Sequence, residues 1–170
     1  ITASGADHSI EHNHIYRVMQ TMSDGAGIYI TFCQRIVVRG NFVHDVHDGG
    51  HGGASAYYLD EQAEDCLVER NLAVRVPWMT HHHMARRNTL RHNVLTSETG
   101  GLITLPKSSD YTFEGNVLDA REDIVIRNFS GIAAFTDNVL FSRRGSIEVE
   151  ELDGYKAAER RPLRPGRSRI

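Results

Sequence analysis

The sequence predicts an all-β fold, a parallel β-helix of roughly six to seven coils. Two observations lead to this prediction. A short asparagine-centred motif recurs through the chain, and the apolar residues around each copy alternate with the period of two that is typical of strands. Helix-capping patterns and a 3.6-residue periodicity are absent. A solenoid of strands therefore explains the pattern better than a leucine-rich repeat or a helical solenoid does.

The motif has the same form in all six copies: an apolar residue lies three positions before the asparagine, and another follows two positions after it. The copies span residues 10–15, 38–43, 68–73, 90–95, 113–118 and 135–140, with Asn13, Asn41, Asn71, Asn93, Asn116 and Asn138. Successive asparagines are 28, 30, 22, 23 and 22 residues apart. Because asparagine tolerates the left-handed conformation, we expect it at a bend between two strands. Stacked on successive coils, the amides would form a hydrogen-bonded ladder.

The first two spacings are longer because one corner of those coils is expanded. In the short coils the chain turns quickly into the strands at residues 101–105, 123–126 and 146–149. In the first two coils, residues 17–26 precede the strand at 27–30, and residues 46–55 precede the strand at 56–59. Both insertions leave the same corner of adjacent coils. We therefore expect them to stand side by side as the walls of a cleft, where loops on a rigid scaffold carry binding groups.

Composition and charge restrict the class of protein. Residues 1–154 hold 13 Lys and Arg against 21 Asp and Glu, whereas residues 155–170 hold 6 against 1. The sequence thus predicts a single acidic domain over 1–154 and a basic, disordered tail over 155–170. An acidic body is a poor partner for nucleic acid. The chain has no run of 18 apolar residues, so no membrane span is expected, and no signal peptide is visible.

The two cysteines, Cys33 and Cys66, are too few for a disulfide framework or a four-cysteine zinc site, so we expect both in the core. Acidic residues instead gather around the expanded loops. Residues 40–69 contain no Lys or Arg but seven carboxylates: Asp45, Asp48, Asp60, Glu61, Glu64, Asp65 and Glu69. Three histidines, His44, His47 and His51, lie in the same stretch, and His81, His82 and His83 follow about one coil later. Loop expansion and charge clustering coincide, which favours a site here.

Strand alternation selects one face for this site. If Leu59 points into the coil, Tyr58 and Asp60 point outward, and an inward Met84 leaves His81 and His83 outward. The expected outer face then carries Tyr29, Tyr58, Asp60, His81 and His83. Aromatic rings beside a carboxylate suit a sugar, which needs an apolar surface for stacking and a charged group for its hydroxyls. Tyr29, Tyr58, His81 and Trp78 are accordingly the candidate substrate-binding residues.

The asparagine bends, together with residues 24–29 (DGAGIY) and 56–61 (AYYLDE), resemble the right-handed parallel β-helix superfamily that includes pectate lyases and several β-helix glycoside hydrolases. The resemblance covers residues 8–149. It implies a right-handed solenoid, a carbohydrate substrate and a secreted or periplasmic location. Many unrelated polysaccharide enzymes share this fold, so the reaction must be argued from the site.

Charge decides between the chemistries of that superfamily. Polyuronate lyases need clustered Lys and Arg or calcium, whereas the body has one lysine, Lys107, and a negative cleft. We therefore expect a glycoside hydrolase that cleaves a neutral glycan with two carboxylates and requires no cofactor. Asp60 is the first candidate, and the partners considered are Asp24, Asp48 and Glu61, with His83 beside them. In a simple register Asp24 lies ~16 Å from Asp60 along the strand, so only a loop that folds back would bring them together.

Three alternatives stay open. A metal-dependent polysaccharide lyase would use a divalent ion, for which His44, His47 and His51 offer imidazole ligands in a glycine-rich loop. A non-catalytic module, or a truncated β-helix, would bind an oligosaccharide or polysaccharide without cleaving it. Exposed end coils would in that case favour self-association, because an uncapped coil presents unpaired strand edges.

Overall fold

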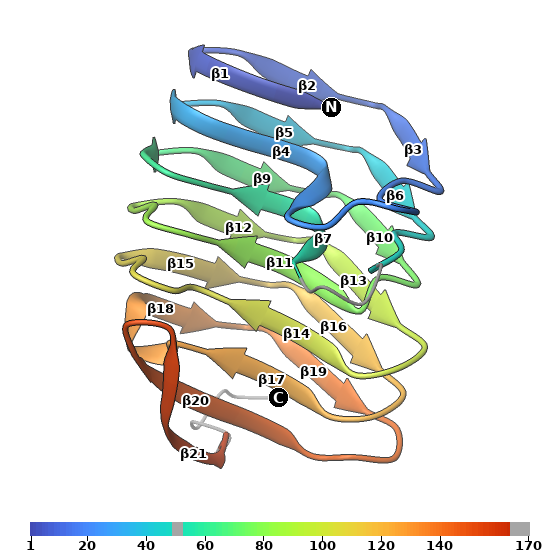
Figure 1. Ribbon diagram of the computed structural model, residues 1–170, viewed down its shortest axis with the longest axis vertical. Helices are drawn as coiled ribbons and strands as arrows, with labels where there is room; N and C mark the ends of the chain where they lie inside the picture. Colours follow the sequence, from blue (N-terminus) through green and yellow to red (C-terminus); the bar gives the residue numbers. More distant parts are fainter. Residues whose placement is uncertain (49–52, 164–170) are drawn as a thin grey trace.

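Three sheets of stacked strands build the molecule (Figure 1). The computed structural model describes residues 1–48 and 53–163. Within these ranges the strand pairs are parallel, except for the antiparallel pair of β20 (Ile147–Asp153) and β21 (Lys156–Pro162). We call the sheets A, B and C, and a coil is one passage of the chain through all three. This arrangement is consistent with a β-helix-like solenoid, as the asparagine repeat predicted.

Each sheet takes one strand from every coil. Sheet A contains β1 (Thr2–Ala6), β4 (Gly25–Gln34), β7 (Ala54–Leu59), β11 (Trp78–His82), β14 (Gly101–Thr104), β17 (Ile124–Arg127), β20 (Ile147–Asp153) and β21 (Lys156–Pro162), with the short β8 (Ala63–Glu64) beside β4. Sheet B contains β2 (Ser9–Glu11), β5 (Val37–Arg39), β9 (Leu67–Glu69), β12 (Thr89–Arg91), β15 (Tyr111–Glu114) and β18 (Ile132–Thr136). Sheet C contains β3 (His14–Tyr16), β6 (Phe42–His44), β10 (Leu72–Val74), β13 (Val94–Ser97), β16 (Val117–Ala120) and β19 (Val139–Ser142). A 3₁₀ turn, Phe129–Gly131, precedes β18.

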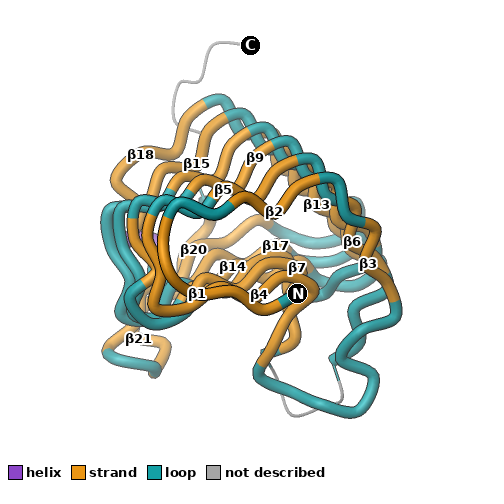
Figure 2. The backbone as a smooth tube through the Cα atoms, turned by 90° about the horizontal axis from the view of Figure 1, so that it is seen from above, coloured by secondary structure: helices purple, strands orange, loops and turns teal. Residues whose placement is uncertain are grey.

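The inner faces of the three sheets enclose one continuous apolar core. Seen along the axis, successive coils superimpose around this common interior (Figure 2). Alternate residues of many strands fill it; in β15, for example, Tyr111 and Phe113 are buried while their neighbours are partly exposed. Cys33 and Cys66 are both buried in it with their sulfur atoms 3.8 Å apart, as the sequence predicted.

The asparagine ladder runs along the corner between sheets B and C. The side-chain Nδ2 of each asparagine donates to the Oδ1 of the next, over 2.9–3.0 Å at every step from Asn13 to Asn138. The same amide groups also bond backbone atoms of the adjacent strands. One detail differs from the expectation. The residue with a positive φ is the one before each asparagine: His12, Gly40, Arg70, His92, Gly115 and Asp137. The bend therefore belongs to that residue, and the asparagine satisfies the backbone groups that the bend leaves open.

The expanded loops leave the corner between sheets C and A in the first two coils (Figure 2). Backbone hydrogen bonds join them: His47 N donates to Val18 O over 3.1 Å, and Gly25 N donates to Gly53 O over 3.1 Å. The two loops thus lie side by side, as expected, although residues 49–52 lie outside the described part of the chain.

The C-terminal segment departs from the expected division at residue 154. Residues 156–162, which were expected to belong to a disordered tail, form β21 and pair with β20. Residue 154 is the glycine of the connecting turn, with a φ of +64°. The basic residues have partners here, since Arg160 bonds Glu148 and lies 3.8 Å from Asp123.

No helix in residues 1–48 and 53–163 has the length and apolar character needed to cross a membrane.

Candidate functional site

The outer face of sheet A carries the predicted aromatic residues in one row. Tyr29 of β4, Tyr58 of β7 and His81 of β11 are register partners, and Thr104 of β14 continues the row. Their rings are in contact: the Tyr29 and Tyr58 centroids are 4.8 Å apart, and those of Tyr58 and His81 are 4.4 Å apart. The alternation argument therefore placed this row correctly.

Two details of that argument were wrong. Met84 does not point inward: it has a φ of +52° and is 46% exposed, because the strand has already ended. His82 is the inward residue and is fully buried, which leaves its neighbours on the outer side. Tyr58 is only 3% exposed, because Tyr29 and His81 pack against it from both sides. It therefore supports the site and offers no open platform for a sugar.

The tyrosine pair brings Asp24 and Asp60 to one place. Tyr29 Oη donates to Asp60 Oδ2 over 2.5 Å, and Tyr58 Oη lies 3.5 Å from Asp24 Oδ1. The loop before β4 folds back to achieve this; Asp24 has a φ of +55° and the Gly53 backbone lies against it. Both carboxylates thus border adjacent rings, in spite of their ~16 Å separation in a simple register.

The proximity of these groups shifts their acidities. Burial and the hydrogen bond to Asp60 raise the pKa of Tyr29 to about 12. Burial and the two nearby carboxylates also raise the pKa of Tyr58. Burial opposes ionisation of Asp60, but hydrogen bonds from Tyr29 and His83 outweigh it and lower the pKa of this carboxyl. Asp60 is therefore an ionised carboxylate at neutral pH, flanked by protonated phenols.

A chain of polar contacts leads away from Asp60 on its other side. Asp60 Oδ1 lies 2.9 Å from His83 Nδ1, and His83 Nε2 lies 2.7 Å from Tyr155 Oη. Lys107 Nζ lies 4.4 Å from the centre of the Tyr155 ring. Tyr155 belongs to the turn between β20 and β21, so this turn reaches His83, the residue that follows β11. A carboxylate, an imidazole and a phenol in series form a path along which protons can pass.

His81 and Trp78 extend the aromatic row along β11. The Trp78 and His81 ring centroids are 5.5 Å apart in an edge-on arrangement. Burial lowers the pKa of His81 to about 4, so its ring is neutral at pH 7. Its Nδ1 contacts Thr104 Oγ1. These rings form a mixed aromatic and polar wall next to the two carboxylates.

The other two acidic candidates, Glu61 and Asp48, lie in a turn and in an expanded loop. Glu61 follows Asp60 in the turn, where its carbonyl accepts bonds from Phe32 N and Thr31 Oγ1. Asp48 is partly buried near the beginning of the second expanded loop, next to residues outside the described part. The structure thus groups the side chain of Asp60 with those of Tyr29 and His83, and places Asp24 beside the neighbouring Tyr58.

The acidic stretch at residues 40–69 does not form one negative cleft. Its carboxylates project from different sheets, and arginines of neighbouring coils neutralise several of them. The ion pairs are Asp45–Arg75, Glu64–Arg86, Glu64–Arg87, Asp65–Arg87, Glu69–Arg39 and Glu69–Arg91. A count along the sequence could not reveal these pairs, because the partners are 22–30 residues apart.

Of the histidines considered as metal ligands, His44 is the last residue of β6 in sheet C. His44 Nδ1 is 2.6 Å from Asp45 Oδ2, and its Nε2 is 2.8 Å from His14 Nε2. His47 is exposed, and His51 lies outside the described residues. Within residues 1–48 and 53–163, no group of three or more His, Cys, Asp and Glu side chains is arranged to hold a metal ion.

Sequence reasoning missed Tyr155, Lys107 and Thr104. Tyr155 was assigned to the tail, and Thr104 and Lys107 carry no local motif. The register of β14 places Thr104 beside His81, and the turn between β20 and β21 brings Tyr155 to Lys107.

The comparisons with known proteins add no relative: no family model, no curated protein and no solved structure matches the chain.

Proposed function

We propose that this protein is a glycoside hydrolase that cleaves a neutral glycan on the outer face of sheet A. The observation that supports the proposal is the placement of Asp24 and Asp60 against the contacting rings of Tyr29 and Tyr58. Hydrolysis of a glycosidic bond uses two carboxyl groups, one as acid and one as base or nucleophile. Within the proposal the chain is a right-handed β-helix of the pectate-lyase-like kind, since connections between parallel strands are almost always right-handed.

The environment of Asp60 decides which carboxyl group is the base or nucleophile and which is the acid. Asp60 is held ionised by Tyr29 and His83, so it is the base or nucleophile. Asp24, which lies beside the Tyr58 hydroxyl, is the other carboxyl group of the pair and takes the remaining role, the acid that protonates the leaving oxygen. The bond from the anomeric carbon to that oxygen then breaks, and water supplies the new hydroxyl. No cofactor takes part in this scheme.

Two substitutions test the proposal. Asp60→Asn removes the ionised group and is expected to lower kcat at least about 100-fold on the glycan that the wild type cleaves. Asp24→Asn is expected to cause a loss that is smaller for substrates with good leaving groups, as for an acid. The matched control is Asp137→Asn, at an exposed bend between β18 of sheet B and β19 of sheet C. Full activity of a folded Asp60→Asn protein would contradict the proposal.

A β-elimination of a uronate-containing glycan is the second candidate, and one observation favours it. Lys107, the one lysine of the body, lies against Tyr155, which contacts His83. A cation that holds the uronate carboxylate, a base that takes the neighbouring proton and a phenol that protonates the leaving oxygen are the groups this reaction needs. Unsaturated products from polygalacturonate or alginate, lost in Lys107→Met, would favour this candidate over hydrolysis. Saturable glycan binding without any product would instead indicate a binding module.

A further inference from the structure

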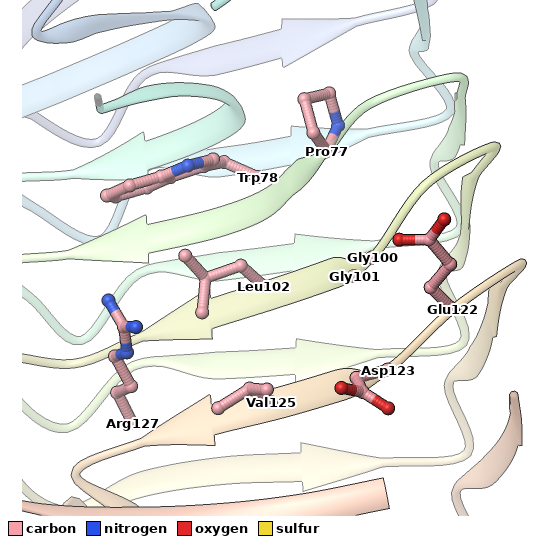
Figure 3. Close-up of a pocket in the computed structure, with 9 residues that line it drawn as sticks. All are labelled: Pro77, Trp78, Gly100, Gly101, Leu102, Glu122, Asp123, Val125 and Arg127. Carbon is pink, nitrogen blue, oxygen red and sulfur yellow. The ribbon is translucent and has the colours of Figure 1, made fainter. Parts of the chain in front are cut away.

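A pocket opens on the same face of sheet A, beyond the tyrosine pair. It encloses about 310 Å³ over β11, β14 and β17 (Figure 3). Its floor is a row of register partners, Trp78, Leu102 and Val125. All three side chains are partly exposed. The pocket is therefore an apolar platform with an aromatic ring at one end, built on rigid strands.

Polar groups surround this platform. Glu122 and Asp123 stand together at one side of the pocket, across from Trp78 and Arg127 (Figure 3). Asp123 is fixed, because its Oδ1 accepts bonds from Ser146 N over 2.7 Å and from Ser146 Oγ over 3.0 Å. These hydrogen bonds hold the pKa of Asp123 below its usual value. Asp123 is thus an ionised acceptor beside an apolar surface.

The charge of the pocket is negative. Arg127 is committed to Glu150, with its Nε 2.6 Å from the carboxylate of that residue. Its positive charge is therefore already balanced. Arg160 lies 3.8 Å from Asp123 but bonds Glu148, and Glu122 is exposed at the rim. A carboxylate-bearing sugar would meet repulsion here, and a neutral sugar would donate hydroxyl hydrogens to the two acidic side chains.

We propose that this pocket is a subsite that binds a neutral sugar ring by stacking on Trp78, with Glu122 and Asp123 accepting hydroxyl hydrogen bonds. This inference rests on the proposed function for its place in the reaction. The Trp78 ring contacts His81, and His81 contacts Tyr58, so the pocket continues the row that leads to Asp24 and Asp60. From β7 to β17 the distance along the stack is ~14 Å. The substrate is therefore a chain of several sugars lying along the molecular axis.

The experiment uses the fluorescence of Trp78, the single tryptophan of the chain. The probes are neutral hexasaccharides of glucose, mannose, galactose, xylose and N-acetylglucosamine, with hexagalacturonate as the anionic comparison. We expect a saturable emission change with at least one neutral probe and none with hexagalacturonate. Trp78→Ala, followed by calorimetry, should weaken that binding about tenfold, the effect of losing one aromatic stack. Glu122→Gln should weaken it less.

The controls separate this inference from the proposed function. Phe141→Ala removes an aromatic ring that is 58% exposed on sheet C and should leave binding unchanged. Asp60→Asn should retain the fluorescence change even without turnover. If Asp60→Asn cleaves the glycan normally while Trp78 still reports binding, the proposed function fails and the subsite stands. If no neutral probe changes the emission, or if Trp78→Ala binds as the wild type does, the subsite is refuted.

Discussion

His82 shows how one buried side chain can govern the response of the whole fold to pH. Its ring is fully buried, and within the described residues neither nitrogen has a hydrogen-bond partner. Burial and the neighbouring His81 therefore hold the pKa of His82 well below its ordinary value. The folded protein keeps this ring neutral at pH values where the unfolded chain takes up a proton.

Stability should consequently fall as the pH falls below about 6.5, the ordinary histidine pKa, since the unfolded state then binds more protons. Between pH 7.5 and 5.5 the free energy of unfolding should decrease by about 1.4 kcal/mol through His82 alone. Urea unfolding of wild type and His82→Leu at both values measures this. The variant should lose correspondingly less stability on acidification. A variant as acid-sensitive as the wild type would show that another group is responsible, and His47→Asn, at an exposed position, is the control.

Residue positions were predictable to the extent that alternation governs them. The period of two correctly put Tyr29, Tyr58 and His81 in one row, because register partners share a face. Alternation within one strand does not predict which side chains of other coils form ion pairs or hydrogen bonds with it. It could not show that Glu64 and Asp65 are neutralised by arginines, or that Tyr155 reaches His83 across 72 residues of sequence. These contacts depend on how the coils stack and on the C-terminal turn.

At the scale of the element, the asparagine ladder stabilises its central members most. Asn93 is 1% exposed, and its amide group takes part in bonds with Asn71, Asn116 and Val68 O. Asn93→Ala would leave buried backbone and amide groups unpaired, at a cost of about 3 kcal/mol. Asn138→Ala, at the partly exposed end of the ladder, should cost about 1 kcal/mol. Chemical denaturation of both variants tests this; equal losses would mean that the ladder adds little beyond its local bends.

On sheet B, acidic and basic side chains alternate from coil to coil, and the buried Glu69 lies between two arginines. Glu69 is 3% exposed and accepts bonds from Arg39 over 2.6 Å and from Arg91 over 2.7 Å. Glu69→Gln removes the charge between two guanidinium groups and should lower stability by about 2 kcal/mol at pH 7. Glu11, which meets only Arg39 at 3.3 Å and is more exposed, is the matched control. Glu11→Gln should change stability by less than about 0.5 kcal/mol, and a comparable loss in both variants would contradict the role given to burial.

At this scale the coils were predictable from the sequence, whereas the residues that form the bends were not. The asparagine spacing reveals each coil because the amide is needed once per coil. The left-handed residue before it varies among His, Gly, Arg and Asp, so no single residue type marks the bend. The strand β21 lacked any apolar alternation and was missed for that reason; all its residues are exposed.

For the whole molecule, stability should decrease from the middle toward both ends. Strand β7 is buried along its entire length, whereas β3 and β19 alternate exposed and partly buried residues. In a stacked repeat each coil is supported only by its neighbours, so outer coils open more easily. Hydrogen–deuterium exchange should therefore be slowest in β7, β11 and β14 and fastest in β1, β3 and β19. Uniform exchange along the chain would indicate a single all-or-none opening.

The ladder also means that the stack of coils can change its height only by whole coils. Every coil between Asn71 and Asn138 begins and ends with the same amide geometry, and its strands in sheet C pair without a register shift. Duplicating or deleting one such unit changes the height of the stack by ~4.8 Å and leaves each remaining joint intact. Gene duplication can thus lengthen or shorten the outer face of sheet A beyond β11 in whole steps of one strand spacing, while the adjacent strands that carry Asp60 and Trp78 stay paired.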